Sequence, residues 1–123
     1  MGTRQHSDHE SASKIASKTI RCAMTTSASL GLRLCGMQVY HPNSGLYIRR
    51  DKYYGRLLDN ITFVDALRQF FYNGTHWLID TIKSFIIRLE EFYNVVSRET
   101  RYRFYSASLL MVYEGDPNAS TSE

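Results

Sequence analysis

Three cationic side chains near the start of the sequence have the spacing of one helix face. Lys14, Lys18 and Arg21 are four and three residues apart, which places them on the same side of an α-helix. Like charges at this spacing repel one another by a few tenths of a kcal/mol per pair. A ligand with several phosphate groups would relieve that repulsion through charge-assisted hydrogen bonds. The alternative, from these residues alone, is a solvated charged face without a ligand.

The chain around these cations predicts the helix that would hold them. Residues 1–9 are polar, include Arg4 and His6, and indicate a loop. A helix is expected over residues 10–23, with a weakly apolar inward stripe opposite the cations. That stripe consists of Ala12, Ile15, Ala16 and Thr19. Residues 24–29 are small and polar and indicate a connector.

Alternating apolar residues predict a β-hairpin over residues 32–50. Its turn falls at residues 41–45, which contain Pro42, Asn43 and Gly45. Residues 51–58 form a basic, tyrosine-rich link to the next element.

Two helices are expected after the hairpin, over residues 60–72 and 75–99. Asp59 or Asn60 serves as the first N-cap, and Asn73-Gly74 ends that helix and turns the chain. We expect the two helices to pack as an antiparallel pair. The second helix carries an apolar stripe that predicts core positions, made of Leu78, Ile82, Phe85, Leu89, Phe92 and Val96.

The last predicted element is a strand over residues 103–114, whose near-continuous apolar run is typical of burial on both faces. Residues 116–123 are rich in Asp, Asn and Ser and predict a disordered tail.

A second basic stretch mixes cations with aromatic rings. It consists of Arg49, Arg50, Lys52 and Arg56 with Tyr47, Tyr53 and Tyr54. Such a mixture can bind single-stranded nucleic acid through stacking and phosphate contacts. Because no known nucleic-acid motif accompanies it, a hairpin edge with its connector is the favoured interpretation.

Composition limits the classes of function. The 123 residues are 43% hydrophobic and 22% charged, which is typical of one globular domain. The net charge of +3 divides into +6 over residues 1–56 and −3 over residues 57–123, so the first half favours an anionic partner. The sequence has two cysteines, and two of its histidines, His6 and His9, lie three residues apart. These residues predict neither a disulfide framework nor a metal site. With no secretory signal or membrane-length apolar run, an intracellular protein of the cytoplasm or nucleus is expected, without a membrane partner.

Five short segments occur in an order and spacing that match a known family. They are residues 1–6 (MGTRQH), 35–40 (CGMQVY), 52–56 (KYYGR), 71–74 (FYNG) and 103–110 (RFYSASLL). Together they resemble the inositol polyphosphate kinases, and most of all the inositol hexakisphosphate kinases. The resemblance covers residues 1–115, and Gly2 matches the last residue of the family signature P-x-x-x-D-x-K-x-G.

The resemblance implies an α+β fold related to the protein kinases, of which residues 1–115 would be part of the C-terminal lobe. It implies ATP-dependent, Mg²⁺-assisted phosphoryl transfer to an inositol polyphosphate. The residues that match substrate-binding positions are Lys14, Lys18 and Arg21, with Arg4 and His6 in the preceding loop. Gly2, Ser106 and Ser108 match motif positions with a supporting role.

The catalytic groups of the family have no match in this sequence. The Asp and Lys of the signature would lie before Met1, and the I-D-F segment with its metal-binding Asp has no counterpart. We therefore expect no catalytic residue here, poor binding of ATP and Mg²⁺, and no kinase activity from this chain alone. The alternatives are a fragment of an inositol polyphosphate multikinase, whose Y-E-G resembles residues 113–115, and a non-catalytic module that binds inositol phosphates.

Overall fold

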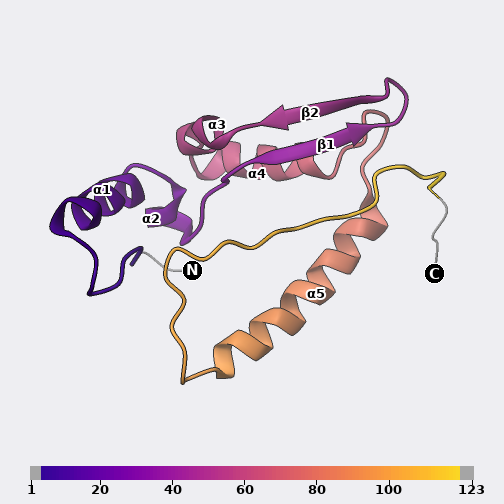
Figure 1. Ribbon diagram of the computed structural model, residues 1–123. Coiled ribbons are helices and arrows are strands. Elements are labelled where there is room, and N and C mark those ends of the chain that lie inside the picture. The colour runs from indigo at the N-terminus through magenta and orange to yellow at the C-terminus, as the bar shows by residue number, and fades with distance from the viewer. Residues whose placement is uncertain (1–3, 120–123) are drawn as a thin grey trace.

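The computed structural model describes residues 4–119, so the predicted motif residue Gly2 lies outside the described residues. Helices and one small sheet alternate along the chain, in agreement with the predicted α+β class (Figure 1). The elements are α1 (Ala12–Ala23), α2 (Thr26–Leu30), β1 (Met37–His41), β2 (Leu46–Arg50), α3 (Lys52–Leu57), α4 (Asn60–Phe70) and α5 (Ile79–Arg98).

The hairpin forms where the turn residues predict it. Strands β1 and β2 pair antiparallel, with Val39 opposite Ile48. The His41 carbonyl accepts hydrogen bonds from the amides of Ser44 and Gly45, and Gly45 has a φ of 66° that suits glycine. Strand β1 begins at Met37 rather than at residue 32, because Leu34 packs against the core beside α4 instead of pairing in the sheet.

Two segments predicted as connectors are short helices. The predicted link over residues 51–58 contains α3, whose N-terminus is capped by the Asp51 carboxylate. The predicted connector over residues 24–29 contains most of α2, which buries Thr26 and Ser27 almost completely. Packing against neighbouring segments stabilises both helices, and a local pattern does not record that packing.

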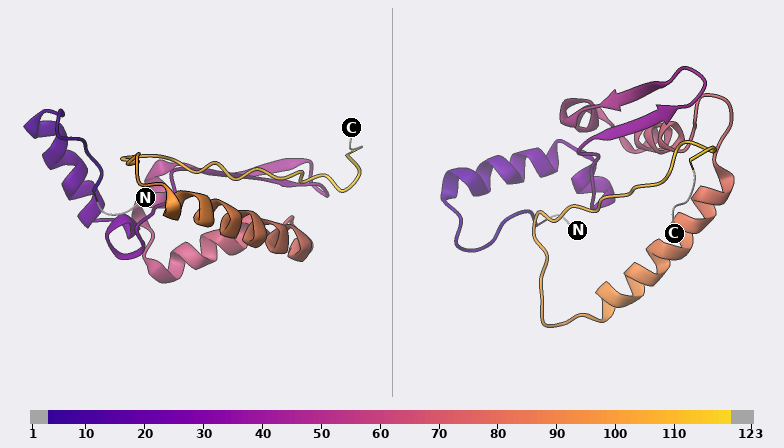
Figure 2. Two further views of the ribbon diagram at one scale, coloured as in Figure 1. Left: turned by 90° about the horizontal axis from the view of Figure 1, so that it is seen from below. Right: turned by 45° about the vertical axis from the view of Figure 1, so that its right-hand side comes forward.

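The core lies where α4 packs against the residues that precede and follow the hairpin. Leu58, Phe63 and Ala66 form its centre, and Leu34 and Tyr54 pack on it. Helix α4 forms as predicted, with an N-terminal cap at Asp59. Seen edge-on, the hairpin and the extended segment 107–116 lie in one layer, with α4 and α5 on one side of it (Figure 2, left).

Helix α5 exists as predicted, but its predicted packing is wrong. None of its residues is buried, and it diverges from α4 rather than lying along it (Figures 1 and 2). Contact is confined to its start, where the Phe85 ring lies 5.5 Å from the Phe71 ring. Leu89 and Phe92, predicted in the core, are 37% and 53% exposed, because no other element of the described chain covers that face.

The predicted buried strand over residues 103–114 is also wrong. This segment is extended but pairs with no strand among residues 4–119, and Leu110 is 84% exposed. Near its end, Tyr113 attaches the segment to α4 by donating a hydrogen bond to the Phe70 carbonyl and packing its ring 5.1 Å from the Phe70 ring. In the predicted tail, Asp116 starts a turn by accepting from the amide of Ala119 through its carbonyl.

No helix in the described part of the chain combines the length and apolarity needed to cross a lipid bilayer.

Candidate anion-binding site

Helix α1 carries the three predicted cations, but its inward side differs from the predicted stripe. Ile15 and Lys18 are half-buried and Cys22 is buried. Ala12, Ala16 and Thr19 of the predicted stripe are exposed. The cation-bearing side therefore overlaps the covered side of the helix, where Glu10 of the preceding loop pairs with Lys18 and α2 packs against α1.

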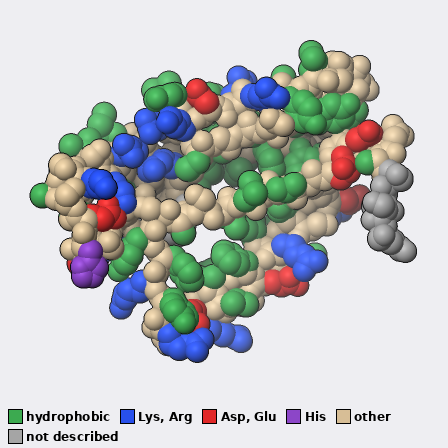
Figure 3. All heavy atoms as spheres, in the orientation of Figure 1, with side chains coloured by type: hydrophobic (Ala, Val, Ile, Leu, Met, Phe, Trp, Pro, Cys, Tyr) green, Lys and Arg blue, Asp and Glu red, His purple; other side chains and the backbone are tan. Residues whose placement is uncertain are grey.

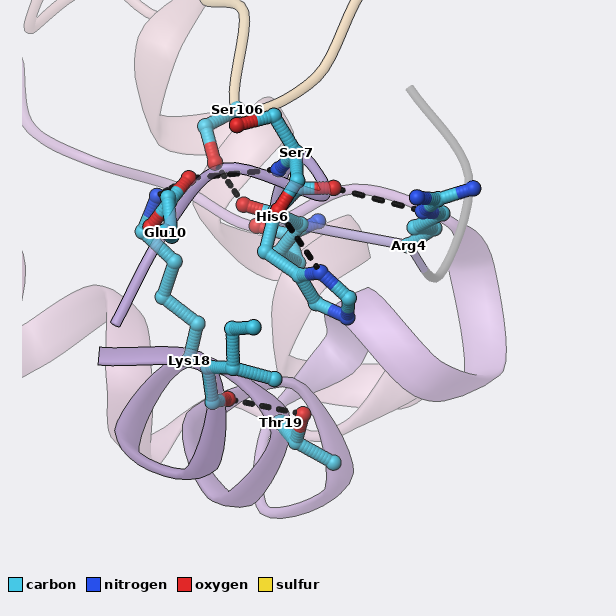
Figure 4. Close-up of polar contacts among 9 residues, drawn as sticks. Arg4, His6, Ser7, Glu10, Lys18, Thr19 and Ser106 are labelled. Atoms are coloured by element: carbon cyan, nitrogen blue, oxygen red, sulfur yellow. Dashed lines mark hydrogen bonds and ion pairs between the residues drawn. The ribbon is translucent and has the colours of Figure 1, made fainter. Parts of the chain in front are cut away.

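An ion pair fixes the loop of residues 4–10 to α1. Lys18 Nζ donates to Glu10 Oε1 at 2.8 Å, with both side chains mostly shielded from solvent. The same carboxylate oxygen accepts from the Ser7 amide at 3.3 Å, as Figure 4 shows. The hydrogen bond from Lys18, followed by that from the Ser7 amide, lowers the pKa of Glu10. The loop thus holds a carboxylate against one of the three cations.

Arg4 and His6, both predicted to bind substrate, lie in this loop but not on the α1 face. The Arg4 guanidinium forms an ion pair with Asp8, donates to the His6 carbonyl at 3.3 Å and lies 4.9 Å from the centre of the Tyr105 ring. His6 Nδ1 lies 3.4 Å from the Ser7 carbonyl oxygen. Arg4 is therefore already engaged, and a phosphate group would have to displace Asp8 to reach it.

Ser106 connects the loop to the extended segment from the far end of the chain. Its hydroxyl donates to the Gln5 carbonyl (Figure 4), and its φ of 51° lies in the left-handed region. Ser108, the other predicted supporting serine, is exposed and makes no contact of this kind among the described residues. Ser106 thus supports the loop that borders the cationic face.

Lys14 and Arg21 are the cations available to a ligand on this face. Within residues 4–119 neither side chain forms an ion pair or a hydrogen bond; Arg21 accepts from the Thr25 hydroxyl only through its backbone carbonyl. Lys14 is exposed and Arg21 half-buried. Cationic side chains gather over α1 and the neighbouring α3 and β2 in Figure 3. An anion at α1 would find two unneutralised charges and a third held by Glu10.

The second basic stretch is held by aromatic rings rather than by carboxylates. Arg50 lies 5.0 Å from the Tyr54 ring centre, and Lys52 and Arg56 each lie 5.2 Å from that of Tyr53. In the described chain none of these cations forms an ion pair with an acidic side chain. The rings of Tyr53 and Tyr54 are thus each in contact with a cation of the same chain.

Residues 4–119 bring no three His, Cys, Asp or Glu side chains together as a metal site.

Sequence reasoning missed the two residues that shape this site most. Glu10 is eight residues from Lys18, outside the three- and four-residue spacings that predict helical ion pairs. Tyr105 meets Arg4 from the opposite end of the chain. Both contacts come from the path of loops, which carry no periodic signal.

Comparison with known proteins places the chain among kinases of inositol phosphates. A family model described as inositol polyphosphate kinase matches residues 1–123. Inositol hexakisphosphate kinase 1 of Rattus norvegicus is 47% identical over 115 residues, which are 94% of this chain and 27% of that protein. Inositol hexakisphosphate kinase 3 of Mus musculus is 43% identical over 121 residues, 98% of this chain and 31% of that protein. The chain thus spans less than a third of these curated relatives.

A solved structure of an inositol phosphate multikinase has the same fold over most of this chain. The TM-score is 0.76, and the match covers 86% of this chain and 53% of the solved one. At 22% identity this likeness concerns the fold alone.

Proposed function

Because this chain belongs to the inositol polyphosphate kinase family, we propose that the α1 face binds the phosphate groups of an inositol polyphosphate. The observation that carries the proposal is the set of Lys14, Lys18 and Arg21 on one side of α1, with only Lys18 neutralised by a described carboxylate. Charge-assisted hydrogen bonds from such a set suit a ligand with several phosphates. The curated relatives are named inositol hexakisphosphate kinases. These names favour inositol hexakisphosphate as the ligand, and they disfavour the alternative that the chain is a multikinase fragment.

Binding should require rearrangement of the loop of residues 4–10. The Glu10 carboxylate accepts a hydrogen bond from the Lys18 ammonium group, so an incoming phosphate competes with this carboxylate. In the proposed complex a phosphate replaces Glu10 at Lys18, while Lys14 and Arg21 contact neighbouring phosphates. The Glu10 carboxylate is therefore a modest intramolecular competitor of the ligand at Lys18.

Calorimetric titration of the chain with inositol hexakisphosphate tests the proposal. Each charge-assisted contact contributes about 1.5–3 kcal/mol, so replacing Lys14 and Lys18 by alanine should weaken binding by more than about tenfold. Glu10→Gln should strengthen it, because the competing charge is removed. A matched control is the pair Lys83→Ala and Arg88→Ala, which removes the same charge from exposed positions of α5.

Two results would contradict the proposal. One is absence of binding by the unmodified chain, and the other is equal weakening by the α1 and α5 variants, which would indicate non-specific attraction to a basic protein. Stronger binding by Glu10→Gln would not by itself distinguish specific binding from non-specific attraction. The comparison of the two double variants therefore decides.

Phosphoryl transfer is a separate proposal. ATP would supply the transferred group in the family's reaction, but the 123 residues contain no match to the signature Asp and Lys or to the I-D-F segment. We propose that this chain binds the inositol phosphate without phosphorylating it. Incubation with ATP, Mg²⁺ and inositol hexakisphosphate should yield no pyrophosphate product, and clear turnover would overturn this statement while leaving the binding proposal intact.

A further inference from the structure

Ser106 follows two closely spaced arginines. Arg101 and Arg103 precede it by five and three residues, and no other serine or threonine of the 123 residues has an arginine at both positions. Ser7 has an arginine only three residues before it, and Ser108 only five residues before it. Arginines placed in this way before a hydroxyl are the charge pattern by which arginine-directed protein kinases select a substrate serine.

The segment that carries Ser106 is extended and open to solvent. Residues 99–113 form no helix or strand within the described chain, and they run on from the end of α5 as an extended connection (Figure 1). Tyr102 and Phe104 are 66% and 56% exposed, and Ser106 is exposed as well. A protein kinase binds its substrate as an extended peptide, so this segment enters such a groove without the unfolding of a helix or a strand.

Both arginines are open to acidic groups of a partner. Arg103 is exposed, and its side chain forms no ion pair or hydrogen bond within residues 4–119. The Arg101 guanidinium pairs with the Glu99 carboxylate at 2.9 Å, but the Arg101 side chain is 78% exposed. Because exposed pairs of this kind contribute little to stability, carboxylates of a partner can replace Glu99.

Phosphorylation would remove a hydrogen bond that holds Ser106 in a strained conformation. The Ser106 hydroxyl donates to the Gln5 carbonyl (Figure 4). Its φ of 51° is a conformation that costs free energy in a residue other than glycine. The neighbouring Tyr105 ring lies 4.9 Å from the Arg4 guanidinium, which places a cation beside the residue that would carry the phosphate.

We propose that Ser106 is a phosphorylation site for a protein kinase that recognises arginine at the third and fifth residues before its target. The Ser106 oxygen forms a bond to the γ-phosphorus of ATP, the bond from that phosphorus to the β–γ bridging oxygen breaks, and ADP leaves. The hydroxyl proton passes to the catalytic carboxylate of the protein kinase. The modified oxygen no longer donates to Gln5, and the phosphate displaces Asp8 from Arg4. The site is independent of the proposed ligand binding at α1.

Phosphorylation of the full chain in vitro tests the site. The chain is incubated with ATP, Mg²⁺ and a purified arginine-directed protein kinase, and the modified residues are located by mass spectrometry. Ser106 should carry the phosphate, and Ser7 and Ser108 should be modified more than about tenfold more slowly, because each lacks one arginine contact. Arg103→Ala should slow modification of Ser106 by a similar factor. Arg98→Ala removes the same charge from an exposed position outside the pattern and should leave the rate unchanged.

The exchange of partners at Arg4 has a readout of its own. The second ionisation of a phosphoserine has a pKa of about 6, and a neighbouring guanidinium lowers this pKa because it favours the dianion. Phosphorus NMR titration of the phosphorylated chain should show the lowered pKa. Arg4→Ala should return the pKa to its ordinary value, whereas Arg68→Ala, which removes an arginine from the surface of α4, should leave it lowered.

Three outcomes would contradict these expectations. A chain without phosphate on Ser106 would overturn the site, and a modified peptide of residues 99–110 in the same assay would then show that the fold shields the serine. Equal rates at Ser7, Ser106 and Ser108 would overturn recognition through the two arginines. A phosphoserine pKa that Arg4→Ala leaves unchanged would overturn the exchange at Arg4. None of these outcomes bears on inositol hexakisphosphate binding at α1.

Discussion

Helices α4 and α5 follow one another along the chain, but only α4 buries side chains in the core. Helix α4 buries Phe63 and Ala66 beneath the hairpin side of the molecule. Helix α5 is nearly twice as long and buries no residue. The difference teaches that periodicity identifies the apolar face of a helix, whereas the neighbouring elements decide whether that face is buried.

The two helices also differ in how their ends are secured. Asp59 caps α4 through a reciprocal capping box with Thr62. Helix α5 begins at Ile79, and its N-cap residue Leu78 makes no side-chain capping hydrogen bond. Its described ion pairs are local ones three residues apart, such as Asp80 with Lys83. Helix α4 is therefore stabilised by tertiary packing and by capping, and α5 mainly by its own backbone and surface pairs.

The contrast between the two helices is largest at two phenylalanines, one on each helix. Phe63 on α4 is 9% exposed and Phe92 on α5 is 53% exposed. Phe63→Ala should lower the free energy of unfolding by about 3–5 kcal/mol, because it leaves a cavity in the core. Phe92→Ala should change it by less than about 0.5 kcal/mol. Urea unfolding followed by circular dichroism measures both, and equal losses would mean that α5 is covered in solution.

A second test addresses the close approach of α3 to the backbone of Leu34, in the segment before β1. A Cβ on Gly55 would lie 2.0 Å from the Leu34 carbonyl oxygen, and backbone cannot yield there cheaply. Gly55→Ala should therefore cost about 1–3 kcal/mol of unfolding free energy. Gly36→Ala is the control, because its Cβ would meet the Arg50 carbonyl at an ordinary 3.6 Å. Similar losses from both variants would show that the Leu34 contact does not constrain the fold.

The cap of α4 gives a smaller and pH-dependent effect. Hydrogen bonds to the Asp59 carboxylate, first that from the Thr62 amide, lower the pKa of Asp59. A lowered pKa in the folded state means that the stabilisation is present above the unfolded pKa and is lost as the pH falls through the folded value. Asp59→Ala should lower Tm by a few degrees at neutral pH, and the gap from the unmodified chain should close in acid.

Asp65→Ala provides the control for that titration. Asp65 lies on the same helix and pairs with Arg68 at the surface, where such pairs contribute little. Its Tm should stay near that of the unmodified chain across the same pH range. A constant Tm gap for Asp59→Ala from neutral to acid pH would refute the assignment of the cap.

Sequence patterns predicted the elements that local chemistry determines. The hairpin turn, the Asp59 cap and the extents of α1 and α5 follow from turn residues, capping and periodicity. Helices α2 and α3 were missed, because their short segments form through contacts such as Gly55 against Leu34. In the candidate site, the three cations could be predicted from spacing, but Glu10 against Lys18 could not, because loops bring these two together.

The smallest expected effect concerns the uncovered stripe of α5. Leu89 is 37% exposed and sits in the middle of that stripe, so Leu89→Gln should alter the unfolding free energy by less than about 0.5 kcal/mol. The same change should reduce self-association at high protein concentration, because it interrupts an exposed apolar face. Sedimentation velocity with urea unfolding measures the two quantities on one sample. A loss of stability comparable to that of Phe63→Ala, with unchanged association, would place Leu89 in a core and remove the contrast between the two helices.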